Sequence, residues 1–110
     1  MNPDLAWHYE TGAHDGHTII TLIGEIDMRG AGTLHDILQK ALHTAEAVTV
    51  DIAGVGFIDS TVISAFVAAR NSAQSTDRTF AVINPGAQVR RVLQITGVLD
   101  TLTDPHSVQP

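Results

Sequence analysis

The feature that most constrains the fold is a strand that leads through a short turn into a helix, between residues 48 and 70. Val48 to Ile52 alternate apolar, β-branched side chains with Thr49 and Asp51, which is typical of a buried strand. Residues 53–56 contain two glycines and predict a turn. Residues 62–69 are apolar except for a single serine, which predicts a buried helix. The chain therefore contains at least one strand–turn–helix unit.

Asp59, Ser60 and Thr61 lie at the junction between the turn and this helix. The first turn of a helix has unpaired N–H groups and a partial positive charge. Asp, Ser and Thr commonly cap such an end, so the three residues are first interpreted as an N-cap. An exposed hydroxyl here would also lie where a phosphate is stabilised. Spacing alone favours the cap and leaves the second interpretation open.

Composition limits the chain to a single globular domain, residues 1–110, without a membrane or nucleic-acid partner. Hydrophobic residues make up 44% and charged residues 16%, which is typical of a folded domain. No apolar run approaches the ~20 residues of a membrane span, and the first residues do not resemble a signal peptide. The absence of cysteine fits a cytoplasmic location. The net charge of −6, with Arg90-Arg91 as the only basic pair, argues against phosphate-backbone binding.

Hydrophobic periodicity predicts the order ββαβαβαβ and hence an α/β fold with a mixed, mostly parallel sheet and flanking helices. The expected strands are 5–9, 18–23, 48–52, 79–83 and 99–102, joined by a turn at 11–16 and by helices at 28–44, 62–69 and 87–96, with a frayed tail at 104–110.

Two helix starts and one sheet edge carry specific expectations. Thr33 is interpreted as a cap for a late start of the 28–44 helix, because Gly30 and Gly32 weaken its first turn. Residues 84–86 are interpreted as a cap with proline in the first turn. In a parallel sheet the strands end at one edge, where α/β folds place their binding sites. The side chains expected to gather there are Asp27, Asp59, Ser60 and Asn84.

Three segments resemble the signature segments of STAS domains, and most closely those of the bacterial anti-sigma factor antagonists. They are GEID at 24–27, DIAGVGFIDST at 51–61 and INPGAQVRRVLQITG at 83–97. The resemblance extends from about residue 5 to about residue 102, and its central segment is the most specific. It implies a STAS-like fold.

The resemblance implies that Ser60 corresponds to the phosphorylated serine of that family and that Asp27 and Asp59 are the acidic residues beside it. Family members are not enzymes and need no cofactor or metal. Their unphosphorylated form binds an anti-sigma factor kinase and releases a sigma factor. The kinase phosphorylates the serine and so breaks the complex, and a phosphatase restores it. The partner-binding residues then expected are Asp27, Asp59, Thr61, Val62 and Asn84.

The sequence departs from the family pattern at two points. Val62 replaces a glycine that usually follows the serine and its neighbour, and a branched side chain in an exposed first turn would obstruct kinase docking. The departure favours an alternative, a STAS module that senses a ligand or acts as a scaffold without being phosphorylated. The second departure is at the end of the chain, where the usual final helix is expected to be missing.

Other chemistries are poorly supported. Asp27 either positions the Ser60 hydroxyl or a magnesium-bound nucleotide brought by the kinase, or is only a turn residue. The sequence around Ser60 lacks the G-x-S-x-G pattern of a hydrolase, and no histidine is placed as its base. A phospho-aspartate receiver would need a lysine late in the chain, whereas the only lysine is Lys40. The six histidines lack the spacing of a metal site.

Overall fold

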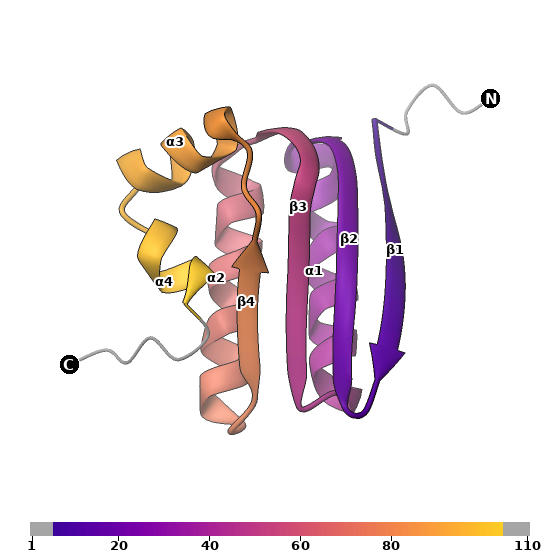
Figure 1. The fold of residues 1–110 in the computed structure, drawn as a ribbon. Helices are drawn as coiled ribbons and strands as arrows, with labels where there is room; N and C mark the ends of the chain where they lie inside the picture. Colours follow the sequence, from indigo (N-terminus) through magenta and orange to yellow (C-terminus); the bar gives the residue numbers. More distant parts are fainter. Residues whose placement is uncertain (1–5, 105–110) are drawn as a thin grey trace.

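A sheet of four strands in the order β1-β2-β3-β4 forms the centre of the computed structural model, which describes residues 6–104. Helices α1 and α2 lie side by side behind the sheet in Figure 1, whereas α3 contacts β3 and α4 lies next to β4. The elements are β1 (Trp7–His14), β2 (His17–Ile26), α1 (Met28–Thr44), β3 (Ala47–Ile58), α2 (Ser60–Ser75), β4 (Thr79–Ile83), α3 (Ala87–Ile95) and α4 (Leu99–Thr103).

The strand directions confirm the predicted α/β class. β1 pairs with β2 in antiparallel fashion, and β2, β3 and β4 run parallel to one another. α1 connects β2 to β3, and α2 connects β3 to β4, so both crossovers are helical, as parallel neighbours require. The carboxyl ends of β2 and β3 consequently meet at one edge, where Ile26 pairs with Ile58.

The β1–β2 hairpin is longer than the sequence predicted. Its loop consists of Asp15 and Gly16 alone, with positive φ angles of 50° and 79°. A two-residue loop with positive φ at both positions matches the right-handed twist of the strands it joins, and Asp-Gly is favoured there. Thr11 to His14, expected in the turn, therefore belong to β1.

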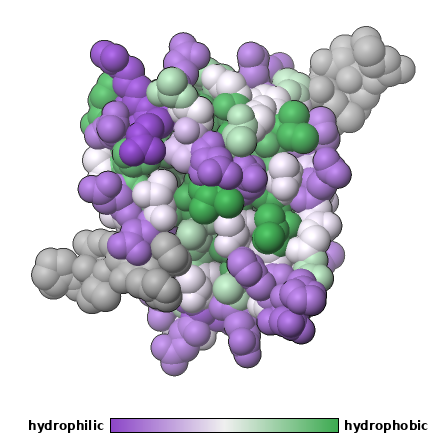
Figure 2. Space-filling view, in the orientation of Figure 1, coloured by the Kyte–Doolittle hydropathy of each residue, from purple (hydrophilic) through white to green (hydrophobic). Residues whose placement is uncertain are grey.

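The core lies between the sheet and the two helices behind it. Alternate residues of β2 and β3 are fully buried, including Ile20, Leu22, Val50 and Ile52, and they pack against the buried stripe of α1. Figure 2, which faces the opposite side of the sheet, shows hydrophobic and hydrophilic residues interspersed. One face of the sheet is thus closed by helices, which gives the alternating burial.

β3 continues through the segment where a turn was predicted. Residues 53–58 remain extended and paired with β2, although the register shifts twice along this pair. Val55 and Ile58 are both buried, and this tertiary burial holds the segment in the sheet despite its glycines. The predicted turn at 53–56 is therefore wrong, and the strand ends directly at Asp59.

The predicted final strand at 99–102 is also wrong, because these residues form the helix α4. Leu99 and Leu102 are both buried, whereas Asp100 is exposed, and this i, i+3 spacing is helical. Gly97, at φ +78°, ends α3 and redirects the chain. The described chain thus ends with a short helix, whereas the sequence predicted a strand at 99–102 and the absence of a final helix. Of the expected tail, residues 105–110 lie outside the described residues.

Between residues 6 and 104, no helix combines the length and the apolar character needed to cross a membrane.

Candidate functional site

The N-termini of α1 and α2 meet at a single carboxylate, that of Asp59. Asp59 is the N-cap of α2, and its Oδ1 accepts hydrogen bonds from the backbone N–H groups of Thr61 at 3.0 Å and Val62 at 3.3 Å. The Thr61 hydroxyl also donates to this oxygen. Three donors thus fix one side of the carboxylate, which is the arrangement predicted for an N-cap.

The other oxygen of the same carboxylate holds the first residue of α1. Asp59 Oδ2 accepts a hydrogen bond from the backbone N–H of Met28 at 2.9 Å. The two residues are far apart in the chain, so this contact exists only because β2 and β3 end side by side. Asp59 therefore fixes the N-terminus of α1 relative to that of α2.

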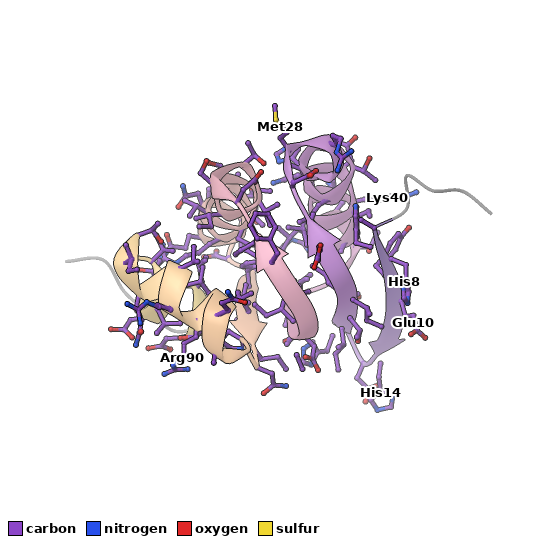
Figure 3. All side chains as sticks on the ribbon, turned by 90° about the horizontal axis from the view of Figure 1, so that it is seen from above. His8, Glu10, His14, Met28, Lys40 and Arg90 are labelled. Atoms are coloured by element: carbon purple, nitrogen blue, oxygen red, sulfur yellow. The ribbon has the colours of Figure 1, made fainter. Side chains whose placement is uncertain are left out.

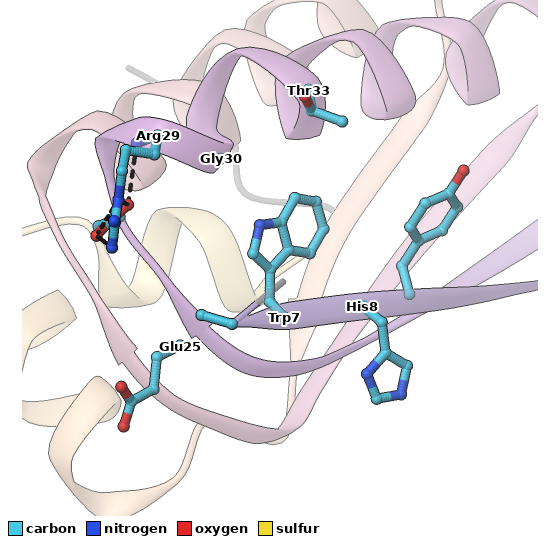
Figure 4. A pocket seen from close by; sticks show the side chains of 9 residues that line it. Trp7, His8, Glu25, Arg29, Gly30 and Thr33 are labelled. Atoms are coloured by element: carbon cyan, nitrogen blue, oxygen red, sulfur yellow. Dashed lines mark hydrogen bonds and ion pairs between the residues drawn. The ribbon is translucent and has the colours of Figure 1, made fainter. Parts of the chain in front are cut away.

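Asp27 caps α1 in the same way. Its Oδ1 accepts from the backbone N–H of Arg29 at 2.9 Å, and its Oδ2 forms an ion pair with Arg29 Nη2 at 2.9 Å (Figure 4). The helix thus begins at Met28, directly after Asp27. The predicted late start at Thr33 is wrong, because the side chain of Asp27 supplies the cap that the two glycines seemed to lack.

Hydrogen bonds lower the pKa of both capping carboxylates below the ordinary value of an aspartate. Hydrogen bonds from the Arg29 side chain and backbone lower the pKa of Asp27, and the charge of Arg29 adds to this effect. The Thr61 hydroxyl lowers the pKa of Asp59, together with the backbone N–H groups of Val62, Thr61 and Met28. Donors that bind the ionised form favour it over the neutral acid. Two negative charges therefore stand at this edge of the sheet at neutral pH.

Ser60 is the first residue of α2, and its side chain is exposed. Its hydroxyl makes no hydrogen bond with any residue of the part of the chain that the structure describes. The neighbouring hydroxyl of Thr61 is instead bound to Asp59. Of these two adjacent hydroxyls, that of Ser60 is the one presented to an enzyme from outside.

The side chain of Val62 is fully buried in the core, at 0% exposure. The expectation that it lies exposed in the first turn is wrong, because the third residue of α2 already points toward the sheet, as Ile63 and Phe66 also do. A branched side chain here contributes to the core and does not obstruct a partner. Only the backbone N–H of Val62 belongs to the site.

Asn84 is not brought into contact with the other expected site residues. β4 ends at Ile83, which pairs with Asp51, whereas β3 continues to Ile58 before it reaches the site. Within residues 6–104, no hydrogen bond joins Asn84 to Asp27, Asp59 or Ser60. The cap of α3 is Gly86, so the predicted cap beginning at Asn84 is also wrong.

Two exposed hydrophobic side chains near Ser60 were missed by the sequence analysis. Met28 is 71% exposed and projects away from the molecule in Figure 3, and Phe57, three residues before Ser60, is 49% exposed. We call Met28, Phe57 and Ser60 the α2 docking surface.

Among the described residues, no group of three or more His, Cys, Asp or Glu side chains is placed to hold a metal ion.

Comparison with known proteins gives consistent likenesses. A sequence model of the family described as "Mlab, STAS domain" matches residues 10–104. The anti-sigma-B factor antagonist of Staphylococcus epidermidis is 27% identical over 97 residues, which cover 84% of this chain and 87% of that protein.

Solved structures show the same architecture. The crystal structure of an anti-sigma factor antagonist from Mycobacterium paratuberculosis superposes with a TM-score of 0.80 at 26% identity, covering 94% of this chain and 86% of that one. The anti-sigma factor antagonist SpoIIAA in its unphosphorylated form gives 0.76 at 17% identity, covering 87% and 85%. The Bacillus SpoIIAA in its phosphorylated form gives 0.70 at 16% identity, covering 87% and 88%.

Proposed function

The chain belongs to the STAS domain family, and we propose that it is an anti-sigma factor antagonist whose binding to a partner protein is switched off by phosphorylation of Ser60. The proposed partner is an anti-sigma factor with serine kinase activity, and a phosphatase restores the unphosphorylated form. The chain itself acts by binding and not by catalysis, as a single STAS domain in the cytoplasm.

The observation that carries this proposal is the exposed side chain of Ser60 at the start of α2, whose hydroxyl bonds to none of residues 6–104. A kinase transfers the γ-phosphoryl group of ATP to the serine oxygen, so that the O–H proton leaves, a P–O bond forms and ADP departs. That reaction needs a hydroxyl that reaches out of the domain. Ser60 meets the requirement without unfolding of α2.

A phosphate on Ser60 would change the charge of the surface more than its shape. It would add about −1.5 to −2 charges beside the ionised carboxylates of Asp27 and Asp59. The helix N-terminus stabilises negative charge, so the domain should remain folded. SpoIIAA, which shares this fold, has been solved in both forms, and this supports a switch without a change of fold. A docked partner would then be repelled by charge.

The burial of Val62 removes the sequence argument against phosphorylation. The alternative, a STAS module that senses a ligand or acts as a scaffold, rested on the bulk of Val62 in an exposed turn, and that side chain is in the core. The exposed side chain of Ser60 therefore supports the proposed switch, and experiment can distinguish the switch from the alternative module.

The test is incubation with ATP and the cognate anti-sigma kinase, followed by intact-mass spectrometry. We expect one added phosphate on the natural chain and on Ser64→Ala, and none on Ser60→Ala. Ser64 is the matched control because it is an exposed serine on the same helix. An unmodified natural chain would support the alternative module, whereas a phosphate that persists in Ser60→Ala would contradict Ser60 as the modified residue.

Binding supplies the second test. Isothermal titration with the kinase should give similar affinities for the natural chain and Ser60→Ala. Ser60→Glu should bind about a hundredfold more weakly, a loss of about 2.8 kcal/mol, because like charges at an interface oppose docking. Equal affinities for the two variants would contradict electrostatic exclusion.

A further inference from the structure

A pocket of about 350 Å³ lies between β1 and the first turns of α1. Figure 4 shows the Trp7 ring between β1 and α1, with Thr33 on the helix above it. Trp7 and Tyr9 form an aromatic wall, with ring centroids 6.3 Å apart and planes tilted by 34°. Pockets that bind small molecules in proteins start at about 300 Å³ and are lined mostly by apolar and aromatic groups. The size and lining fit a ligand of one or two rings.

The position of Trp7 depends on Gly30. Gly30 is buried in α1, and a Cβ built on it would lie 2.3 Å from Trp7 Nε1. Only glycine at this position lets the indole ring lie against the helix. Glycine has a lower helix propensity than alanine, so its presence inside α1 is explained by the packing of the indole ring against it.

The pocket offers hydrogen-bonding groups that the described residues leave unused. The Trp7 indole N–H and the hydroxyls of Tyr9 and Thr33 form no hydrogen bond with any residue of the range 6–104. The N–H is a donor, and each hydroxyl can donate or accept. A ligand with one polar substituent can therefore be held in orientation.

The charges around the pocket are not directed into it. Asp27 and Arg29, at its edge, are bound to each other at 2.9 Å. In Figure 4 the carboxylate of Glu25 and the ring of His8 point away from Trp7. The charged residues that line the pocket are thus either paired with each other or turned away from Trp7. This disfavours an ionic ligand, because its charge would lose water without gaining a partner.

We propose that this pocket binds a small neutral aromatic compound that carries one hydroxyl or carbonyl group. Its ring lies against Trp7 and Tyr9, and its polar group bonds with the indole N–H or the Thr33 hydroxyl. This pocket adjoins the α2 docking surface, because Asp27 and Arg29 line it on either side of Met28 in the chain, but binding in it does not depend on the proposed phosphorylation.

The single tryptophan of the chain makes the test direct, because the indole N–H signal of Trp7 is unique in a ¹H–¹⁵N NMR spectrum. Three probes share one ring and differ in charge: benzyl alcohol, benzoate and benzylammonium. We expect benzyl alcohol to shift the signal saturably, with a Kd on the order of 1 mM for so small a molecule. Both ions should bind at least about tenfold more weakly. A linear, non-saturating shift, or equal responses to all three, would overturn the proposal.

Variants locate the binding. Gly30→Ala should displace the ring and weaken benzyl alcohol binding at least about tenfold, whereas Gly32→Ala should not, because a Cβ at Gly32 meets nothing within 4 Å. Should Gly30→Ala fail to fold, Thr33→Phe fills the pocket from an exposed position, with His35→Phe as its control on the same helix. Undiminished binding in Thr33→Phe would place the ligand elsewhere and contradict the assignment.

Discussion

Asp59 is the residue that links most of the contacts at the candidate site. One of its oxygens caps α2, and the other accepts the backbone N–H of Met28 at the start of α1. A neutral side chain of the same shape could keep only part of this arrangement. An asparagine carbonyl oxygen can still cap α2, but its NH₂ group cannot accept a hydrogen bond from Met28.

This asymmetry predicts graded losses of stability. Asp59→Ala should lower the free energy of unfolding by about 1–2 kcal/mol, because an N-cap is lost. Asp59→Asn should lose less, because asparagine caps helices about as well as aspartate. Urea denaturation followed by circular dichroism measures both. Equal losses in the two variants would show that charge matters here more than capping geometry.

The capping carboxylates also predict a dependence of stability on pH. The pKa of Asp27 and that of Asp59 lie below the ordinary value of 3.8 in the folded state. A lowered folded pKa stabilises the fold above the unfolded pKa, and this contribution is lost as the pH falls through the folded value.

The contribution of these two carboxylates to the free energy of unfolding should therefore be constant from about pH 7 to pH 5. It should decrease when the pH is lowered below about 4. In Asp59→Asn the decrease should be shallower, because only Asp27 still titrates. Urea midpoints measured at several pH values test this. A decrease in Asp59→Asn as steep as that of the natural chain would mean that other groups dominate.

At the level of elements, the turn after α3 determines where the last helix lies. Gly97 has φ +78°, and the backbone N–H of Val98 donates to the carbonyl oxygen of Leu93 across this turn. The turn directs Leu99 and Leu102 of α4 into the core next to β4. A residue other than glycine would hold this conformation only under strain.

Gly97→Ala should consequently lower the free energy of unfolding by about 1–2 kcal/mol, because a left-handed backbone is costly for a residue with a Cβ. Gly12→Ala is the matched control. Neither added Cβ would meet an atom within 4 Å, but only Gly97 of the two has a positive φ. Thermal unfolding of both variants separates backbone strain from crowding. A Gly12→Ala variant as unstable as Gly97→Ala would rule out strain as the cause.

The elements that could be predicted from sequence are those with strong periodicity of their own. α1 has the predicted bounds, and β4 likewise, because local pattern and tertiary burial agree there. Two glycines indicated a turn within residues 53–58, but the burial of Val55 and Ile58 keeps this segment in the sheet. The segment of four residues from Leu99 is too short for a helical periodicity to be distinguished from that of a strand.

Some residues of the candidate site stood out in the sequence, whereas the contacts between them did not. Asp59 and Ser60 stood out because capping chemistry at a strand–helix junction is local. The bond between Asp59 and Met28 and the burial of Val62 depend on how β2 and β3 end together, which no local pattern contains. The packing of the Trp7 ring against Gly30 could not be predicted for the same reason.

At the scale of the whole molecule, the α2 docking surface joins two exposed apolar side chains to Ser60, next to the carboxylates of Asp27 and Asp59. Met28 and Phe57 are two of the large hydrophobic side chains that remain exposed in the described part of the chain. Met28 donates its backbone N–H to Asp59, the residue before Ser60, and Phe57 precedes Ser60 by three residues. Apolar anchors of this kind supply most of the binding energy at protein interfaces, whereas charges at the rim govern specificity and rate. The two kinds of contact predict different responses to mutation.

Phe57→Ala and Met28→Ala should each weaken binding of the kinase by about 1–2 kcal/mol, because an exposed anchor is removed while the core is untouched. Ile95→Ala is the control, since Ile95 is 74% exposed on another element, α3. Isothermal titration gives the affinities, and circular dichroism confirms that each variant is folded. A loss of similar size in Ile95→Ala would place the interface elsewhere.

Salt should distinguish repulsion by charge from obstruction by bulk at Ser60. The chain carries a net charge of −6, and a negative group at Ser60 would join the carboxylates of Asp27 and Asp59 on this surface. The Debye length falls from about 10 Å at 0.1 M salt to about 3 Å at 1 M. The affinity ratio between Ser60→Ala and Ser60→Glu should therefore shrink as salt rises.

Ser64→Glu is the control, because it places the same charge one turn along the exposed side of α2 and should weaken binding less at every salt concentration. A ratio that stays constant across this range would mean that the added side chain blocks docking by its size, and the electrostatic account of the switch would have to be abandoned.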